Sequence, residues 1–405
     1  MTQAQAIMNQ LSNRINQMQE SATIKMSKMS RELKAQGHDI IDLSLGEPDF
    51  DTPQHIKDAA KEAIDKGFTK YTPVPGYLEL RKAISVKFKR DNNLDYSPDE
   101  IVVSTGAKQS IFNVVLSLIN PGDEVLLPAP YWVSYAAVVE LAEGKYTEIP
   151  STIDTNFKVT AAQLEQCITP KTKLIIFSSP CNPTGSVYSK AELEGIAGVL
   201  KRHPHVFALC DEIYEYINFT GERHHSLAEF SDIKGQVITV NGFSKGFAMT
   251  GWRLGYIGAP GWIAKACDKM QGQITSGTCS IAQKAGEAAL LGDLTPSHKM
   301  VEQFKKRRDI VYSLLKEVPG LKVNLPDGAF YFFPDVSAYF GKSFNGTILN
   351  TPEDISLYLL REAKVAMVSG ESFGDKNCIR LSYATSEEKL REACKRMKDA
   401  FAKLA

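Results

Sequence analysis

From residue 100 onward, short apolar runs alternate with longer segments of helical character, and this alternation limits the folds open to the chain. Runs such as Leu174-Ile175-Ile176-Phe177 contain no polar positions, which is typical of strands covered on both faces. We predict strands at 101–104, 124–127, 173–178, 206–210 and 236–240, with helices at 107–119, 131–141 and 190–202. The pattern predicts an α/β fold with a mostly parallel central sheet flanked by helices. Such a sheet binds its ligand at the carboxyl ends of its strands.

The character of the sequence changes after about residue 295. We predict a long charged helix at 297–317, helices at 352–363 and at the C-terminus, and strands at 323–325, 329–333, 366–368 and 379–383. A polar arm at the N-terminus leads into a predicted helix at 21–36 and a strand at 40–45. We therefore expect a large ligand-binding domain at 46–295. Residues 1–45 and 296–405 would form a smaller α+β domain that closes over the active site.

The overall charge gives no reason to expect a nucleic acid or an anionic membrane as a partner. The chain has 47 basic and 47 acidic residues and a formal net charge of +0. Its seven cysteines are scattered and form no C-x-x-C pair, which is typical of reduced thiols and favours a cytoplasmic location. No spacing of Cys, His and carboxylate residues supports a metal site. No stretch approaches the roughly 18 apolar residues of a membrane-spanning helix.

A glycine-rich block, Asn241 to Tyr256, follows the last of the predicted parallel strands and contains Ser244, Lys245 and Arg253. Small residues beside a lysine at a strand end allow a flat ligand to approach without steric obstruction. The arginine eight positions further on can reach an anionic group on the same ligand. The block therefore predicts a site in which Lys245 is the reactive group.

Other strand ends carry groups that suit the same ligand. Gly106, Ala107 and Lys108 open a helix whose free N–H groups and dipole can bind an anion. Trp132 could stack on a planar heteroaromatic ring, or it could be an ordinary core tryptophan. Asn182 lies between turn-forming residues with its amide placed to donate to a ring oxygen.

The strand at 206–210 is followed by Asp211 and Tyr214. A carboxylate at the end of a buried strand needs a positive partner, and a pyridinium nitrogen is such a partner. The hydroxyl of Tyr214 can bind a phenolic oxygen on the same ring. Arg380 follows a strand of the smaller domain, and its guanidinium has two parallel donors that match an α-carboxylate.

Three blocks together, S-P-C-N-P-T-G, D-E-I-Y and S-K-x-x-x-x-x-G-W-R-x-G-Y, resemble class I, fold-type I aminotransferases that use pyridoxal phosphate. The resemblance covers nearly the whole chain and is closest to the bacterial aspartate aminotransferase subgroup. It implies three catalytic residues: Lys245 binds the cofactor covalently, Asp211 pairs with the ring nitrogen and Tyr214 binds the ring oxygen. The other residues that it implies for cofactor binding are Asn182, Trp132, Gly106, Ala107, Lys108, Ser244, Arg253 and Tyr71.

The resemblance also implies substrate contacts. Arg380 would bind the α-carboxylate, while Gly46, Trp132 and Asn182 would lie against the substrate. Lys108 would bind a distal carboxylate together with hydroxyl groups of Ser21 and Thr23. Tyr71 would contact the phosphate of the neighbouring subunit, which implies a homodimer with shared active sites.

The implied activity is transfer of an amino group from aspartate or glutamate to a 2-oxo acid such as 2-oxoglutarate or oxaloacetate, by a ping-pong mechanism. Three alternatives stay open: an aromatic or prephenate aminotransferase, a pyridoxal-phosphate-dependent lyase, and a non-catalytic protein that kept the fold. The segment Phe340-Gly341-Lys342-Ser343 is not a nucleotide-binding loop, because Val336 stands where the first glycine is needed.

Overall fold

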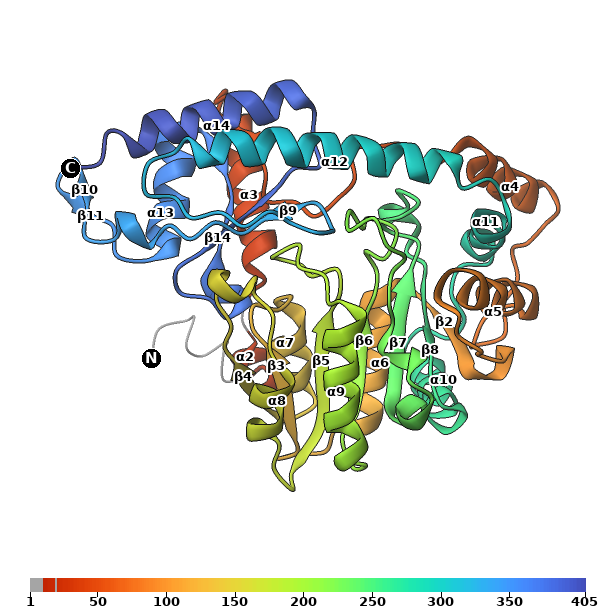
Figure 1. Ribbon diagram of the computed structural model, residues 1–405. Helices are drawn as coiled ribbons and strands as arrows, with labels where there is room; N and C mark the ends of the chain where they lie inside the picture. The colour runs from red at the N-terminus through yellow and green to blue at the C-terminus, as the bar shows by residue number, and fades with distance from the viewer. Residues whose placement is uncertain (1–9, 19) are drawn as a thin grey trace.

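The centre of the fold is a seven-stranded sheet (Figure 1) in a computed structural model that describes residues 10–18 and 20–405. Its strands are β2 Ile101–Ser104, β3 Glu124–Pro128, β4 Lys145–Ile149, β5 Thr172–Ser178, β6 Phe207–Asp211, β7 Val237–Gly242 and β8 Gly255–Gly258. They lie in the order β2-β8-β7-β6-β5-β3-β4, and only β8 is antiparallel to its neighbours. The predicted mostly parallel sheet is confirmed.

Helices cover both faces of this sheet. One face packs against α4 Gln54–Asp65, α5 Leu78–Asn92, α8 Ala161–Cys167, α9 Lys190–Arg202 and α11 Ser280–Leu291, and the other against α6 Ala107–Leu118, α7 Ser134–Leu141 and α10 Gly261–Ile274. The side chains at positions 174–177 of β5 show why this part of the strand is apolar. Ile175 and Phe177 join the core on the first face, while Leu174 and Ile176 join the core on the second. Successive side chains of a strand point to opposite faces, so a strand covered on both sides has no polar position.

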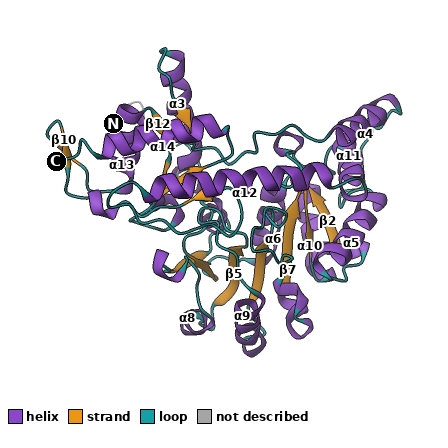
Figure 2. Ribbon diagram, turned by 45° about the horizontal axis from the view of Figure 1, so that its top comes forward, coloured by secondary structure: helices purple, strands orange, loops and turns teal. Residues whose placement is uncertain are grey.

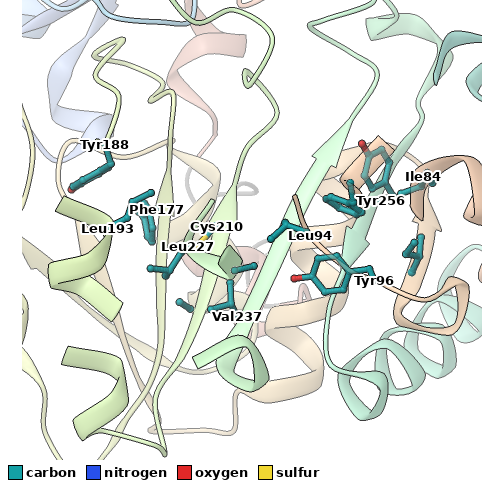
Figure 3. Packing of buried hydrophobic residues seen from close by; sticks show 14 of the residues in the cluster. Ile84, Leu94, Tyr96, Phe177, Tyr188, Leu193, Cys210, Leu227, Val237 and Tyr256 are labelled. Carbon is teal, nitrogen blue, oxygen red and sulfur yellow. The ribbon is translucent and has the colours of Figure 1, made fainter. Parts of the chain in front are cut away.

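Figure 3 shows part of the first of these two cores. Ile84 of α5 and Leu193 of α9 lie at opposite ends of this layer, with Phe177, Val237 and Tyr256 of the sheet between them. All five side chains are at most 5% exposed. The sheet edge above this core is therefore held by a rigid, continuous layer, which fixes the positions of the loops that follow each strand.

The two ends of the chain come together above the strand ends. This region contains α3 Ala22–Ala35, β1 Ile41–Asp42, α12 Thr295–Lys316, β9 Tyr331–Phe332, β10 Ser343–Phe344, β11 Thr347–Ile348, α13 Pro352–Tyr358, a π-helical turn Leu359–Ala363, β12 Val365–Ala366, β13 Val368–Ser369, β14 Ile379–Ser382 and α14 Glu387–Phe401. The short helix α2 Asn13–Gln17 lies instead beside the large sheet (Figure 1), where Arg14 pairs with Glu143. Strand β1 pairs in parallel with β12, and β13, β14 and β9 form a small antiparallel sheet. Figures 1 and 2 show α12 running across the ends of the large sheet.

Several predicted elements differ from the structure. The strand predicted at 40–45 is reduced to Ile41–Asp42, and residues 323–325 form no strand, since the isolated bridge to Asp335 comes from the preceding Lys322. The helix predicted at 131–141 begins at Ser134, because the backbone after Pro130 stays non-helical. Strand β4 was not predicted, since its exposed edge position gives it the polar sequence Lys145 to Ile149. Within residues 10–18 and 20–405, no helix combines the length and apolar character needed to cross a lipid bilayer.

A close backbone contact joins β8 to the start of α6. Gly255 of β8 pairs with Ser104 of β2, and a Cβ at Gly255 would overlap the backbone of Gly106 and Ala107. Because no side chain can move aside, only glycine allows this approach. The glycine in the G-W-R-x-G-Y block thus sets the position of the first turn of α6.

We expect Gly255→Ala to lower the free energy of unfolding by at least about 1–3 kcal/mol, since β8 and α6 must separate. Urea unfolding followed by circular dichroism measures the change. Gly251→Ala in the same block is the control, because no heavy atom lies within 4 Å of a Cβ there. We expect this control to stay within about 0.5 kcal/mol of the wild type. Equal stability of the two variants would contradict the role given to the contact.

Candidate functional site

Five loops that follow β2, β3, β5, β6 and β7 meet at one edge of the large sheet and surround a cavity of about 340 Å³. The carboxyl ends of parallel strands share one edge, so these loops are neighbours although they are far apart in sequence. The predicted site residues that line the cavity are Ser21, Thr23, Gly46, Ala107, Lys108, Trp132, Asn182, Asp211, Tyr214, Ser244, Lys245, Arg253 and Arg380. The structure therefore brings together all predicted site residues except Gly106, which lies just behind, and Tyr71.

Lys245 lies three residues beyond β7. Its Nζ donates a hydrogen bond to the carbonyl oxygen of Gly46, which belongs to the loop after β1. Burial lowers the pKa of Lys245 to about 8, although the charge of Glu47 acts in the opposite direction. The amino group therefore loses its proton more readily than that of an ordinary lysine, which favours its use as a nucleophile or a general base.

Asp211 is the last residue of β6, and its carboxylate is 5% exposed. It accepts hydrogen bonds from the hydroxyl of Tyr135, at 2.8 Å, and from the backbone N–H of Ile213, at 3.2 Å. Among the described residues no cationic side chain forms a salt bridge with it. Burial raises the pKa of Asp211 to about 6, while the hydrogen bond from Tyr135 acts against this rise. A cationic partner in the cavity would stabilise its charged form.

Arg380 is held on both faces of its guanidinium, which lies 4.7 Å from the ring centre of Tyr331 and 5.0 Å from that of Phe373. It donates to the side-chain oxygen of Asn182 at 3.0 Å and to the carbonyl of Ser44. Its Nε has no hydrogen-bond partner among the described residues. Arg380 is 1% exposed, so its buried charge needs an anionic partner, and a carboxylate in the cavity would provide one.

The other end of the cavity is suited to an anion. Gly106 precedes α6 with a φ of 83°, and a Cβ there would overlap the guanidinium of Arg253. The first N–H groups of α6 have no intrahelical partner, and Ser244 adds a hydroxyl group. Lys108 in the first turn of α6 lies 4.9 Å from the ring centre of Trp132. Partial burial and the charge of Arg253 lower the pKa of Lys108.

Several residues that line the cavity were not predicted from the sequence: Ile24, Leu45, Glu47, Tyr135, Ser178 and Tyr331. Tyr331 of β9 forms a 2.7 Å hydrogen bond between its hydroxyl and that of Tyr214. A buried tyrosine hydroxyl needs a partner, and this requirement is the only signal that could have pointed to Tyr135 or Tyr331. Which partner each one takes depends on the packing of distant segments, which no local pattern specifies.

Tyr71 is the one predicted site residue that lies away from the cavity of its own chain. Its side chain is 97% exposed and is absent from the cavity lining. The loop that carries it leads into α5 on the outer side of the large sheet (Figure 1). Within a single chain, therefore, Tyr71 has no contact with the groups around Lys245.

Residues 38–397 match the family model described as "Aminotransferase class I and II". A probable aspartate/prephenate aminotransferase of Rickettsia bellii is 48% identical over 395 residues, which cover 97% of this chain and 99% of the relative. An aspartate/prephenate aminotransferase of Nitrosomonas europaea is 46% identical over 390 residues, covering 96% and 98%.

Solved structures give the same result for the fold. The aspartate aminotransferase of Rhizobium meliloti superimposes with a TM-score of 0.94 at 43% identity, covering 98% of this chain and 99% of the other. The aspartate aminotransferase of Thermus thermophilus with maleate gives a TM-score of 0.90 at 40% identity, covering 96% and 99%. Nearly the whole length of the chain therefore follows one known architecture.

We expect Asp211→Asn to stabilise the cofactor-free protein at alkaline pH only. Well below pH 3.8, the ordinary pKa of aspartate, the carboxyl group is protonated in the folded and the unfolded chain, so its ionisation contributes nothing. Above about pH 6 it is ionised in both, and the folded state carries a penalty of about 3 kcal/mol. Asparagine keeps the shape without the charge. Urea unfolding at about pH 4 and about pH 8 measures the gain.

The control for this prediction is Asp58→Asn on the exposed face of α4, where Lys61 and Gln54 lower the pKa of the carboxyl group. This variant should show no gain at alkaline pH. An equal gain for Asp211→Asn at both pH values would show that its charge is not the cause.

Proposed function

This chain belongs to the class I and II aminotransferases, and we propose that it transfers the amino group of aspartate or glutamate to a 2-oxo acid with pyridoxal phosphate as its cofactor. The observation that carries this proposal is the cavity in which Lys245, Asp211 and Arg380 converge from separate segments. The amine and the buried carboxylate are the groups that a lysine-bound cofactor requires. The guanidinium of Arg380, whose Nε has no hydrogen-bond partner among the described residues, can bind the carboxylate of an amino acid.

The residues present fit this cofactor. Asp211 is a buried carboxylate without a salt bridge among the described residues, and a pyridinium nitrogen would supply the missing charge. The start of α6, Ser244 and Arg253 form a place for a phosphate. Asn182 and Tyr214 line the cavity between these two ends. The arrangement matches an elongated ligand with a phosphate at one end and a ring beside Asp211.

When bound, pyridoxal phosphate supplies a ring that accepts the electrons left on the substrate α-carbon after deprotonation. Arg380 would bind the α-carboxylate and so orient the Cα–H bond toward the amino group of Lys245. Lys245 would take the proton from the α-carbon as a general base, which its lowered pKa favours. Asp211 would hold its negative charge against the ring nitrogen, and Tyr214 would donate to the ring oxygen.

A dicarboxylic substrate is supported by a cationic group and two hydroxyl groups in the cavity lining. Lys108, Ser21 and Thr23 all line the cavity, and Ser21 is the N-cap of α3 without a side-chain hydrogen bond to that helix. The names of the relatives above include aspartate, and one solved structure contains maleate, which is a dicarboxylate. We infer that Lys108 and these hydroxyl groups bind the distal carboxylate.

Prephenate is a second amino acceptor that the site could take. The relatives of Rickettsia bellii and Nitrosomonas europaea carry prephenate in their names. The cavity is also lined by Ile24 and Leu45, which are 56% and 42% exposed and could cover an apolar ring. A lysine is a point charge that selects geometry less strictly than arginine, so Lys108 is compatible with both acids.

We further infer two domains and a cytoplasmic homodimer. Residues 46–295 would form the large domain, and residues 1–45 with 296–405 the small domain that closes over the site. Tyr71 would reach the phosphate in the neighbouring subunit, which accounts for its exposure in the single chain. The seven cysteines are unpaired, as is common in a reducing compartment.

We expect Lys108→Ala to lower kcat/KM for aspartate and glutamate about tenfold to a hundredfold, because one charge-assisted contact contributes roughly 1.5–3 kcal/mol. Rates with phenylalanine should change little. Steady-state kinetics over both classes of donor measure the difference. Lys25→Ala is the matched control, since Lys25 lies on α3 outside the cavity lining and pairs with Glu353. Equal losses for both classes of donor would indicate that Lys108 acts on the cofactor and would exclude a role for Lys108 in binding the distal carboxylate.

The shared site predicts that two inactive variants complement each other. Tyr71→Ala and Lys245→Ala should each lose most activity, and mixing them under subunit exchange should restore activity in hybrid dimers. Such a hybrid contains one site with both native residues. The measurement is transaminase activity against mixing ratio. If the mixture is no more active than either parent, Tyr71 does not act in the neighbouring subunit.

A further inference from the structure

Four ionisable side chains form a buried cluster that does not line the cavity: Lys87 of α5, Glu212 and Glu215 of the loop after β6, and His224. Their exposed fractions are 0%, 2%, 5% and 7% in that order. Buried charges of this kind are costly unless they compensate each other. The cluster therefore needs an explanation that the catalytic groups do not provide.

One half of the cluster joins α5 to the loop after β6. Lys87 forms an ion pair with Glu215 and donates to the side-chain oxygen of Asn92 at 2.7 Å. Asn92 in turn donates to the second carboxylate oxygen of Glu215 at 2.9 Å. Two side chains of α5, Lys87 and Asn92, therefore hold the two carboxylate oxygens of Glu215. Helix α5 is one of the helices that cover the large sheet.

The other half is the pair formed by Glu212 and His224, with 3.2 Å between Oε2 and Nε2. Two carboxylates and one ammonium leave the cluster neutral only when His224 carries a positive charge. Burial lowers the pKa of His224, but the carboxylate of Glu212 outweighs it, so the net effect is a raised pKa. The other titratable groups that interact with these two carboxylates are Tyr96, Cys210, Asp211, Tyr216 and Tyr256.

The loop after β6 connects this cluster to the cavity. From the last residue of β6 onward, Asp211, Ile213 and Tyr214 line the cavity, while Glu212 and Glu215 belong to the cluster. The next residue, Tyr216, packs so closely against Gly246 that a Cβ there would lie 2.6 Å from its ring. Gly246 directly follows Lys245. Asp211 and Tyr214 are therefore each adjacent in sequence to a carboxylate of the cluster, and Lys245 is linked to it through the contact of Gly246 with Tyr216.

We propose that His224 is a positioning residue for the transamination site: its positive charge compensates Glu212 and thereby keeps the adjacent Asp211 ionised and in place. The proposal rests on the proposed role of Asp211. Burial raises the pKa of Asp211, and the charge of Glu212 raises it further. Without the charge of His224, Glu212 becomes an uncompensated buried anion one residue from the carboxylate that faces the ring nitrogen.

The test is His224→Gln in the cofactor-loaded enzyme, which removes the charge and keeps a hydrogen-bonding side chain. We expect kcat to fall about tenfold with a much smaller change in KM, because the loss concerns charge at the reacting ring and not substrate binding. The pH dependence of the cofactor's visible absorbance should shift in the same direction as in Asp211→Asn. The double variant Glu212→Gln/His224→Gln, which removes both charges, should regain most of the lost kcat.

His203→Gln is the matched control. His203 lies 2.7 Å from Glu165 in a pair that is partly exposed and far from the loop after β6, so kcat and the absorbance should stay as in the wild type. Wild-type kcat and absorbance in His224→Gln would overturn the proposal, as would a double variant that folds yet is no more active than the single one. If His224→Gln does not fold, the double variant alone decides, since the proposal requires it to be active. Activity retained by Asp211→Asn would instead overturn the role of Asp211 itself.

Discussion

The site depends on the desolvation of two groups, the carboxylate of Asp211 and the amine of Lys245. Both lie where parallel strands end under a covering layer, and burial shifts the pKa of each toward its neutral form. A ligand with a positively charged ring nitrogen beside Asp211 and a carbonyl carbon beside Lys245 would offset the cost of burying both groups. The proposed cofactor would therefore gain binding energy by relieving the cost of burying these two groups.

The large sheet determines which side chains can reach the cavity. The middle residues of β3, β5, β6 and β7 are mostly apolar and covered on both faces, so the polar site residues such as Asp211 lie at the carboxyl ends of the strands or just beyond them. The polar site residues therefore lie together at one edge of the large sheet. The helices on both faces of the sheet keep water away from the core beneath that edge. The small antiparallel sheet adds Arg380 and Tyr331 from above, where aromatic rings on both sides of Arg380 hold its charge in place.

Much of this could be predicted from the sequence, for a physical reason. Strands buried on both faces and the short blocks after them are local patterns, so the residue order alone places Asn182, Asp211 and Lys245 at one edge of the sheet. Tyr135 and the cluster around His224 could not be predicted, because their partners lie far away in sequence and depend on how helices pack. The weak strands at 40–45 and 323–325 were misjudged because so few residues of them pair.

The contacts of Arg380 also have a consequence for synthesis of the chain. Its guanidinium bonds to Ser44, 336 residues earlier, and to Asn182, 198 residues earlier. At a translation rate of about 5–20 residues per second, Ser44 is synthesised on the order of tens of seconds before its partner exists. During that interval the sheet can form while the cavity above it stays open and incomplete. Arg380, which we propose binds the substrate carboxylate, is therefore absent from the nascent chain until shortly before the last helix is made.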